Sequence, residues 1–146
     1  MQILLINMKN QTWQKEAVPE DWSRLGGRGL IAKILLDEVP PACDALGPFN
    51  KLIFATGLLA GCRLSSCDRL SAGGKSPLTG GVKESNAGGS TAQRMVDLGL
   101  KAIIIEGQPD TSSLWVLHLN SAGAAFVPAS ELAGKGVYET AELLRK

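Results

Sequence analysis

The residues best suited to chemistry lie between Arg69 and Gly89, in a stretch that contains six of the chain's 17 glycines. The stretch also carries three basic side chains, Arg69, Lys75 and Lys83. Glycine frees backbone N–H groups to approach a ligand, and nearby cations attract negative charge. The segment from Gly61 to Lys83 has four basic residues and one acidic residue, although the net charge of the whole chain is only +1. This pattern predicts a local site for a phosphate or another anion, with a plain glycine-rich hairpin as the alternative.

A helix is predicted to begin directly after this stretch. Ser90 and Gln93 have the spacing of a capping box, in which the Ser90 hydroxyl accepts from the Gln93 amide and the Gln93 side chain returns to Ser90. The N-terminus of such a helix would add partial positive charge beside the glycine-rich stretch.

Two glycine motifs resemble nucleotide-binding loops without completing them. The Gly-Lys-Ser sequence at 74–76 resembles the end of a P-loop, but Arg69 occupies the position of the required first glycine. We therefore reject a nucleotide triphosphatase. The Gly-Gly-Arg-Gly sequence at 26–29 precedes an expected helix, as a dinucleotide-binding turn does, but lacks the G-x-G-x-x-G spacing. A tight turn that allows close helix packing is an equally good interpretation of residues 26–29.

Side chains for nucleophilic or metal chemistry are few. The single histidine, His118, lies in an expected strand and cannot complete a catalytic triad, so a structural role is favoured. Cys43, Cys62 and Cys67 do not have the Cys-x2-Cys spacing of zinc or iron–sulfur sites. An odd number of cysteines without paired spacing argues against a disulfide framework. We interpret all three as small packed hydrophobic residues.

The composition is that of a folded protein without a global affinity for nucleic acid or membranes. Hydrophobic residues make up 45% of the chain and charged residues 20%, which is ordinary for a globular domain. A net charge of +1 recruits neither nucleic acid nor a membrane surface. No apolar run reaches the roughly 18 residues of a membrane span. The first nine residues lack the pattern of a secretion signal, so the expected compartment is the cytoplasm.

Hydrophobic periodicity predicts three helices among several strands. Leu30, Ile31, Ile34 and Leu35 share one face at helical spacing, and the prolines at 40–41 stop that helix. Gly99 suits the left-handed position after a second helix. The expected helices are 30–38, 90–98 and 137–146, and the expected strands are 1–7, 51–56, 69–74, 80–85, 101–106, 113–119 and 123–127.

Five segments occur in the order and spacing of one known family, at 26–30, 46–57, 75–80, 85–89 and 98–107. The most specific pair is Lys-Ser-Pro-Leu-Thr-Gly at 75–80 followed by Asn-x-Gly-Gly at 86–89. As a set, these segments resemble the N-terminal domain of the aldehyde ferredoxin oxidoreductase family, the tungsten and molybdenum bis-pterin enzymes. The resemblance extends over almost the whole chain.

This resemblance implies an α+β fold with mixed β-sheets and two or three helices, on which a tungsten- or molybdenum-bis-pterin lies. It assigns the family's phosphate- and pterin-contacting arginine to Arg69 and its cofactor-contacting glycine to Gly88. The backbone of Asn86 corresponds to a ligand of the magnesium ion that bridges the pterin phosphates. We add Lys75 and Gly89 as cofactor contacts, from charge and proximity. No catalytic residue is assigned to this chain.

One departure from the family pattern lies just before the arginine, where family members usually have Gly-Gly-Arg or similar and this chain has Cys67-Asp68-Arg69. An ion pair between Asp68 and Arg69 would weaken the hold of the arginine on a phosphate. The family domain is also longer, and the [4Fe–4S] cysteines and the acid/base residues lie in later domains. We therefore expect residues 1–146 to form a single N-terminal metallopterin-binding domain that is incomplete, with a C-terminal continuation.

The resulting hypothesis is an N-terminal segment of an aldehyde:ferredoxin oxidoreductase, which forms part of the metallopterin cradle for the oxidation of aldehydes to carboxylic acids. Such a segment is not expected to be active alone. Its implied partners are the remainder of the oxidoreductase, in the same polypeptide or as a separate subunit, and ferredoxin or an iron–sulfur subunit as electron acceptor. A homodimer is also considered; nucleic acid and membranes are not expected partners. The alternatives are a stand-alone pterin-binding or docking subunit without catalysis, and a remnant that binds nothing.

Overall fold

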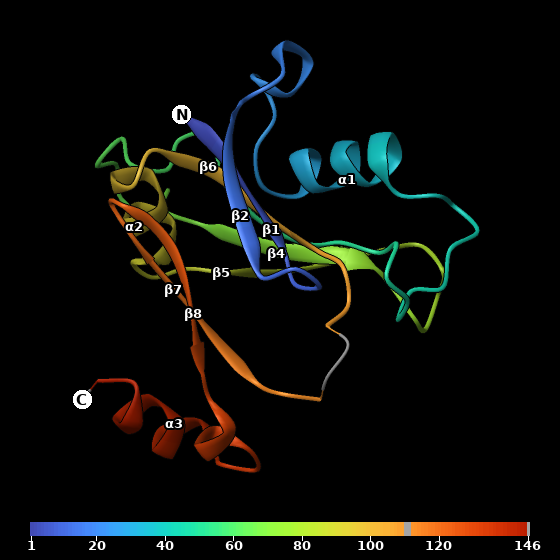
Figure 1. The fold of residues 1–146 in the computed structure, drawn as a ribbon. Helices are drawn as coiled ribbons and strands as arrows, with labels where there is room; N and C mark the ends of the chain where they lie inside the picture. The colour runs from blue at the N-terminus through green and yellow to red at the C-terminus, as the bar shows by residue number, and fades with distance from the viewer. Residues whose placement is uncertain (110–111, 146) are drawn as a thin grey trace. The chain divides into compact units, whose positions relative to one another are not determined.

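The computed structural model describes residues 1–109 and 112–145. The chain divides into two compact units, Met1–Gln108 and Pro109–Lys146. The first unit is built on a six-stranded sheet, and the second contains a two-stranded sheet (Figure 1). The whole 69–89 stretch therefore belongs to the first unit.

The sheet of the first unit is mixed. Its unit consists of β1 (Gln2–Asn7), β2 (Thr12–Ala17), the 3-10 turn η1 (Glu20–Trp22), α1 (Gly27–Glu38), β3 (Leu52–Thr56), β4 (Leu70–Lys75), β5 (Val82–Ala87), α2 (Thr91–Asp97) and β6 (Leu100–Glu106). The strand order is β2-β1-β6-β3-β4-β5. Strands β1 and β6 run parallel, and each other neighbouring pair is antiparallel. The predicted α+β class with mixed sheets is confirmed.

Helix α1 supplies the main core of the first unit. The four residues that share its predicted face, Leu30, Ile31, Ile34 and Leu35, are all buried. The helix ends at Glu38, before the two prolines, as predicted. Its buried face packs with side chains from three strands and from the preceding turn, namely Ile3, Trp22, Ile53, Ala55, Ala102 and Ile104.

Helix α1 begins at Gly27, three residues earlier than the periodicity predicts. Gly26, just before it, passes close to the chain that follows β3. A side chain at Gly26 would place its Cβ atom 2.7 Å from the Leu58 nitrogen and 3.0 Å from the Thr56 carbonyl oxygen. The motif at 26–29 is therefore a tight turn that allows close packing, which confirms one of the two interpretations left open by the sequence.

Strand β6 lies between β1 and β3 and is buried along most of its length. Ala102 and Ile104 belong to the α1-side core, while Ile103 is also buried. This confirms the prediction of a core strand covered on both faces. Lys101 is buried as well; its Nζ donates to the Ser23 carbonyl at 2.9 Å, and burial lowers its pKa.

Helix α2 does not begin with the predicted capping box. Ser90 has helical backbone angles, φ −90° and ψ −6°, and its side chain makes no capping hydrogen bond. Gln93 turns the other way, and its Nε2 donates to Asp97 Oδ1 at 2.8 Å. The prediction is wrong because a capping serine needs an extended backbone to turn its hydroxyl toward the helix. The helix does end as predicted, with Gly99 left-handed at φ +73°.

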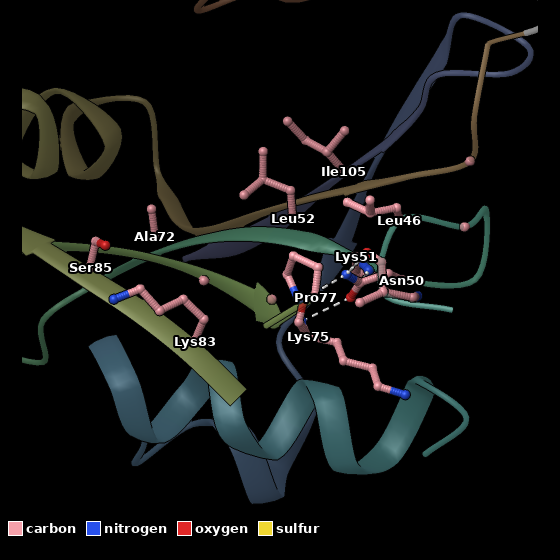
Figure 2. A pocket seen from close by; sticks show the side chains of 15 residues that line it. Leu46, Asn50, Lys51, Leu52, Ala72, Lys75, Pro77, Lys83, Ser85 and Ile105 are labelled. Carbon is pink, nitrogen blue, oxygen red and sulfur yellow. Dashed lines mark hydrogen bonds between the residues drawn. The ribbon is translucent and has the colours of Figure 1, made fainter. Parts of the chain in front are cut away.

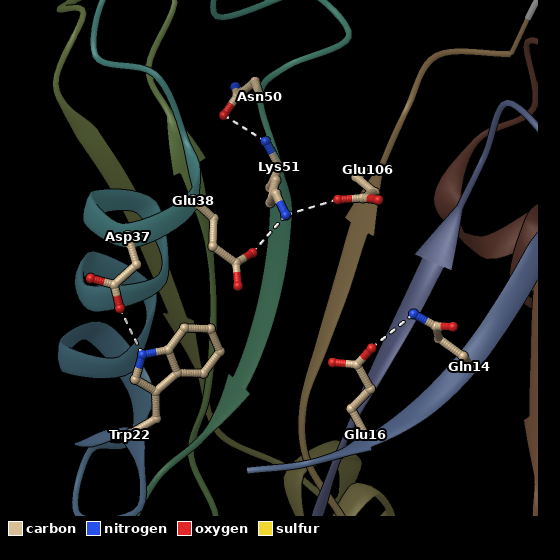
Figure 3. Close-up of polar contacts among 8 residues, drawn as sticks. All are labelled: Gln14, Glu16, Trp22, Asp37, Glu38, Asn50, Lys51 and Glu106. Atoms are coloured by element: carbon tan, nitrogen blue, oxygen red, sulfur yellow. Dashed lines mark hydrogen bonds and ion pairs between the residues drawn. The ribbon is translucent and has the colours of Figure 1, made fainter. Parts of the chain in front are cut away.

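Lys51 ties the end of α1 to the sheet. Its Nζ lies 2.6 Å from Glu38 Oε2 and 2.8 Å from Glu106 Oε2 (Figure 3). Burial lowers the pKa of Lys51, but its hydrogen bonds to the two carboxylates outweigh this and raise the pKa overall. A second contact holds the last turn of the same helix, where Trp22 Nε1 donates to Asp37 Oδ2 at 2.8 Å.

The second unit consists of β7 (Trp115–Asn120), β8 (Gly123–Pro128), the 3-10 turn η2 (Ser130–Leu132) and α3 (Val137–Leu143). Strands β7 and β8 form the predicted antiparallel pair. Asn120 Oδ1 closes their turn by accepting from the backbone of Ala122 and Gly123, at 2.9 and 3.1 Å. The third predicted helix is present, and none of its residues is buried. Across the described residues, no helix has the length and apolar content needed to cross a membrane.

Candidate anion and cofactor site

The 69–89 stretch folds into the hairpin of β4 and β5, with β5 at the edge of the sheet. The turn takes residues 76–81, where Gly80 N–H donates to the Ser76 carbonyl and Ser76 N–H to the Gly81 carbonyl. Strand β5 therefore begins two residues later than predicted. In the register of the hairpin, Leu70 pairs with Ala87. This pairing brings Arg69 and Gly88, the next residue on each strand, to the same end of the hairpin.

Arg69 and Asn86 are in direct contact at that end. Arg69 Nε donates to Asn86 Oδ1, and Asn86 Nδ2 donates to Ser71 Oγ at 3.0 Å. The bond to Asn86 uses the Nε–H of the guanidinium and leaves its four Nη–H groups for other acceptors. A Cβ atom on Gly88 would stand 3.5 Å from Arg69 Nη1. Residue 88 is therefore at contact distance from the donor groups.

A hollow of about 320 Å³ opens at this point, lined by Ser66, Asp68, Arg69, Gly88 and Gly89. Gly89 has φ +107°, a value that side chains rarely tolerate, and a Cβ atom there would meet nothing within 4 Å. The requirement for glycine at this position is therefore conformational. The structure thus gathers four of the five predicted cofactor contacts, Arg69, Asn86, Gly88 and Gly89, at one end of the hairpin.

Asp68 does not form the expected pair with Arg69. Its Oδ1 accepts from the Gly61 N–H at 2.8 Å, so the carboxylate closes the loop between β3 and β4. The salt bridges found among the described residues do not include Asp68. The ion pair suggested by the sequence is therefore not formed, because a nearby backbone donor holds the carboxylate.

Lys75, the fifth predicted contact, lies at the other end of β4. Six residues along a strand separate it from Arg69 by about 20 Å. Its Nζ donates to the carbonyl oxygens of Pro41 and Cys43, each at 2.5 Å. In Figure 2 its side chain points away from Ala72 and Ser85, toward the end of α1. The structure does not bring Lys75 together with the other four residues, and its assignment as a cofactor contact stays a prediction.

A larger hollow of about 550 Å³ lies over the sheet face opposite α1, and the sequence interpretation missed it (Figure 2). Part of its floor is formed by Ala72, Gly74 and Ser85. It is also lined by Leu52 and Lys83. Side chains alternate along a strand, so the small residues at 72, 74 and 85 belong to one face of the hairpin. That alternation of small residues in paired strands was a readable signal of an open platform.

A shielded carboxylate lies on the α1 side of the same hairpin. Glu84 Oε2 accepts from Arg28 Nε and Nη2 at 3.3 and 3.2 Å. The pKa of Glu84 is lowered, first by a hydrogen bond from the Ser71 side chain and then by Arg28, which outweigh burial. Glu84 is thus held as an anion. Neither Glu84 nor Arg28 was predicted to belong to a site.

The cysteines and the histidine do not form a second centre. Cys43 packs against the α1-side core, as predicted. The packing prediction is wrong for Cys62, which is exposed, because its loop contacts α2 through Gly61, whose Cβ position lies 2.6 Å from Val96. Cys67 is half-buried, and His118 is exposed on β7. In the part of the chain that the structure describes, no cluster of three His, Cys, Asp or Glu residues is placed to hold a metal ion.

Comparison with known proteins identifies the family. Residues 3–146 match the family model described as the N-terminal domain of aldehyde ferredoxin oxidoreductase. Tungsten-containing aldehyde ferredoxin oxidoreductases from Pyrococcus horikoshii and Pyrococcus abyssi are each 36% identical over 146 residues, 99% of this chain and 24% of their own length. The enzyme of the same name from Pyrococcus furiosus is 35% identical over 131 residues, 90% of this chain and 21% of its own.

A solved structure gives the same result for the fold. The active-site complex BamBC of benzoyl coenzyme A reductase, determined with 1,5-dienoyl-CoA, matches with a TM-score of 0.91 at 34% identity, over 99% of this chain and 22% of that one. The chain thus spans about a quarter of the length of the curated relatives that it matches. It belongs to the aldehyde ferredoxin oxidoreductase family, as the N-terminal domain of that family.

Proposed function

We propose that this chain forms one side of the metallopterin cradle of a tungsten-type oxidoreductase that converts aldehydes to carboxylic acids. The observation that carries the proposal is the Arg69–Asn86 contact beside Gly88 and Gly89, at the open end of the β4–β5 hairpin. The tungsten-containing enzymes to which the chain is 35–36% identical supply the substrate class and the metal.

The donor set fits the phosphate end of a pterin cofactor. The Nη groups of Arg69 are suited to a phosphate, which a guanidinium binds with two parallel hydrogen bonds. The positive φ of Gly89 and the missing side chain of Gly88 let the backbone come close to such a group. The backbone carbonyl of Asn86 is an oxygen ligand of the kind that magnesium prefers. These residues would hold the phosphates and their magnesium ion.

The face over Ala72, Gly74 and Ser85 suits the ring system of the same cofactor. Its small residues leave a hollow over β4 and β5, which the larger side chains of Leu46, Leu52 and Ile105 line as well. When bound, the metallopterin supplies the oxidation–reduction chemistry, while the protein binds and orients it. The chain's own contribution is therefore positioning, and we assign no catalytic residue to it.

The remaining functions belong to parts outside this chain. We propose that the rest of the oxidoreductase, in the same polypeptide or as another subunit, supplies the second side of the cradle, the [4Fe–4S] cluster and the aldehyde pocket. Ferredoxin or an iron–sulfur subunit is the proposed electron acceptor. Molybdenum in place of tungsten, a homodimer and a cytoplasmic location remain predictions from the sequence.

A second candidate function is favoured by the structural match. The benzoyl coenzyme A reductase complex is 34% identical to this chain, almost as similar as the aldehyde enzymes. The same N-terminal cradle is thus compatible with a reaction on an aromatic coenzyme A thioester. A stand-alone pterin-binding subunit without catalysis is the third candidate, carried over from the sequence.

The proposal is tested on the complete protein that contains this chain. Tungsten, molybdenum and pterin are measured in the purified wild type, in Arg69→Ala and in Arg94→Ala, a control that removes an exposed arginine from α2. We expect Arg69→Ala to lose most of the bound metal and pterin, and Arg94→Ala to retain them. Equal content in all three proteins would remove Arg69 from the site. Assays of aldehyde oxidation with ferredoxin, and of 1,5-dienoyl-CoA formation from benzoyl-CoA, then separate the first candidate from the second.

A further inference from the structure

A line of polar side chains connects the start of α1 to Arg69. Arg69 Nε donates to Asn86 Oδ1, and Asn86 Nδ2 donates to Ser71 Oγ at 3.0 Å. The carboxylate of Glu84 lies within reach of both the Ser71 and the Asn86 side chains, and the two contacts lower its pKa, the one with Ser71 most. At the far end, Glu84 accepts two bonds from Arg28, at 3.2 and 3.3 Å. Two positive groups are thus linked through one carboxylate.

The donors and acceptors between Arg69 and Glu84 all point the same way. Because Ser71 Oγ accepts from Asn86, its single hydrogen is free to donate to Glu84, and an ionised carboxylate only accepts. The carboxylate therefore orients both the Ser71 hydroxyl and the nitrogen side of the Asn86 amide. An amide that presents its nitrogen to Ser71 presents its oxygen to Arg69. Reversing the amide would break both bonds at once.

The middle of this line is shielded from water, although its ends are exposed. Ser71 is 2% exposed and the Glu84 side chain 8%, whereas the Arg28 side chain is 78% exposed. Hydrogen bonds are stronger where water is excluded, and an ion pair with one fully solvated partner contributes little. Gly27 closes the space, since a Cβ atom there would lie 3.1 Å from Ser71 Oγ. The shielded carboxylate, rather than Arg28, thus controls the line.

We propose that Glu84 is a positioning residue for the anion site. Through Ser71 and Asn86 it holds the guanidinium of Arg69 by its Nε, so that the Nη groups stay at the hollow beside Gly88. The inference rests on the proposed function of Arg69 and extends it to a residue outside the segments that carry the family resemblance.

The test is a double-mutant cycle in the complete, cofactor-loaded protein, with the rate of loss of tungsten and pterin during dialysis as the readout. Glu84→Gln keeps the size of the side chain but offers an amide donor to Ser71. We expect it to lose the cofactor about 10-fold faster, as is typical when a group that orients a ligand is removed. Arg69→Ala should lose it at least as fast, and the double variant no faster than Arg69→Ala, since Glu84 acts through Arg69.

Glu139→Gln is the matched control, because it removes a carboxylate from an exposed ion pair with Lys135. Its rate of loss should equal that of the wild type. Losses that add up in the double variant would overturn the proposal, since a general defect in the fold acts independently of Arg69. An unchanged rate in Glu84→Gln beside a fast loss in Arg69→Ala would also overturn it, while leaving the proposed function standing.

An unchanged rate in Arg69→Ala would overturn the proposed function and this inference together. If Glu84→Gln does not fold, Ser71→Ala removes the hydroxyl that contacts both Glu84 and Asn86 and takes its place in the cycle. It should again lose the cofactor faster than the wild type, and combining it with Arg69→Ala should add nothing. Additive losses in that pair would overturn the proposal equally.

Discussion

Lys75 is the basic residue for which sequence and structure point to different roles. The sequence assigns it to the cofactor, whereas in the structure its Nζ donates to the carbonyl oxygens of Pro41 and Cys43. Those bonds hold the loop after α1 against the end of β4. Lys75→Met removes the charged donor and keeps an unbranched side chain. We expect this variant to be less stable and yet to retain the metal and pterin content of the complete protein.

The expected cost follows from the surroundings of the two bonds. The bond to Cys43 is partly buried and the bond to Pro41 is exposed. A hydrogen bond from a charged group contributes about 1.5–3 kcal/mol, and much less where water can replace the donor. The free energy of unfolding should therefore fall by about 2 kcal/mol, nearly all of it from the bond to Cys43. Asn50 still holds the backbone of Lys75 at 3.0 Å through both its N–H and its carbonyl, so the strand itself should persist.

The assay combines urea unfolding, followed by tryptophan fluorescence, with metal and pterin analysis. Lys9→Met is the matched control, because it removes an exposed lysine from the turn after β1, away from both hollows. It should change the free energy of unfolding by less than about 0.5 kcal/mol, as is usual for surface substitutions. The reasoning is refuted if Lys75→Met loses the cofactor while its stability matches that of the control. In that case Lys75 binds the cofactor, as the sequence predicts.

Three further expectations concern the packing of the sheet. Gly73→Ala places a Cβ atom 2.5 Å from a backbone carbonyl oxygen and should lower the free energy of unfolding by about 3 kcal/mol. Gly81→Ala makes only an ordinary contact at 3.7 Å, so its urea midpoint should stay near that of the wild type. Lys51→Met breaks the ion pairs with Glu38 and Glu106 and should cost about 1–2 kcal/mol, since both pairs are partly exposed. The pKa of Lys51 is raised above 10.5, so the advantage of the wild type over Lys51→Met should be complete below pH 10.5 and should disappear as the pH rises through the folded-state pKa. A difference in unfolding free energy that stays constant across this range would contradict the pairing.

The helices and strands could be predicted wherever a local pattern had one solution. The spacing of Leu30, Ile31, Ile34 and Leu35 permits only one buried face on a helix, and that face is the core. A glycine just after an amphipathic run suits a left-handed end, and Gly99 accordingly donates its N–H to the Val96 carbonyl at 2.8 Å. The predicted elements were correct to within a few residues because such rules depend on neighbours in sequence.

The errors occurred where a polar side chain had more than one possible partner. Gln93 was free to return to Ser90 or to reach Asp97, and it contacts Asp97. Asp68 was adjacent to Arg69 in sequence, but the Gly61 N–H lies at hydrogen-bonding distance only in the folded loop. The backbone conformation at the start of the helix and in the loop decides such choices, and the spacing of residues in the sequence does not contain it.

The structure gives a reason for an asparagine side chain at position 86, which the sequence alone did not. The family resemblance uses only the backbone of Asn86, which any residue would supply. In the register of the hairpin, Asn86 lies directly opposite Ser71, so its side chain needs a donor for that hydroxyl and an acceptor for the Nε–H of Arg69. Aspartate would lack the donor and would add a second carboxylate near the shielded Glu84, and serine would be too short to span both partners. The side-chain amide therefore fixes the arginine, while the backbone of the same residue remains available to the magnesium ion that we propose it binds.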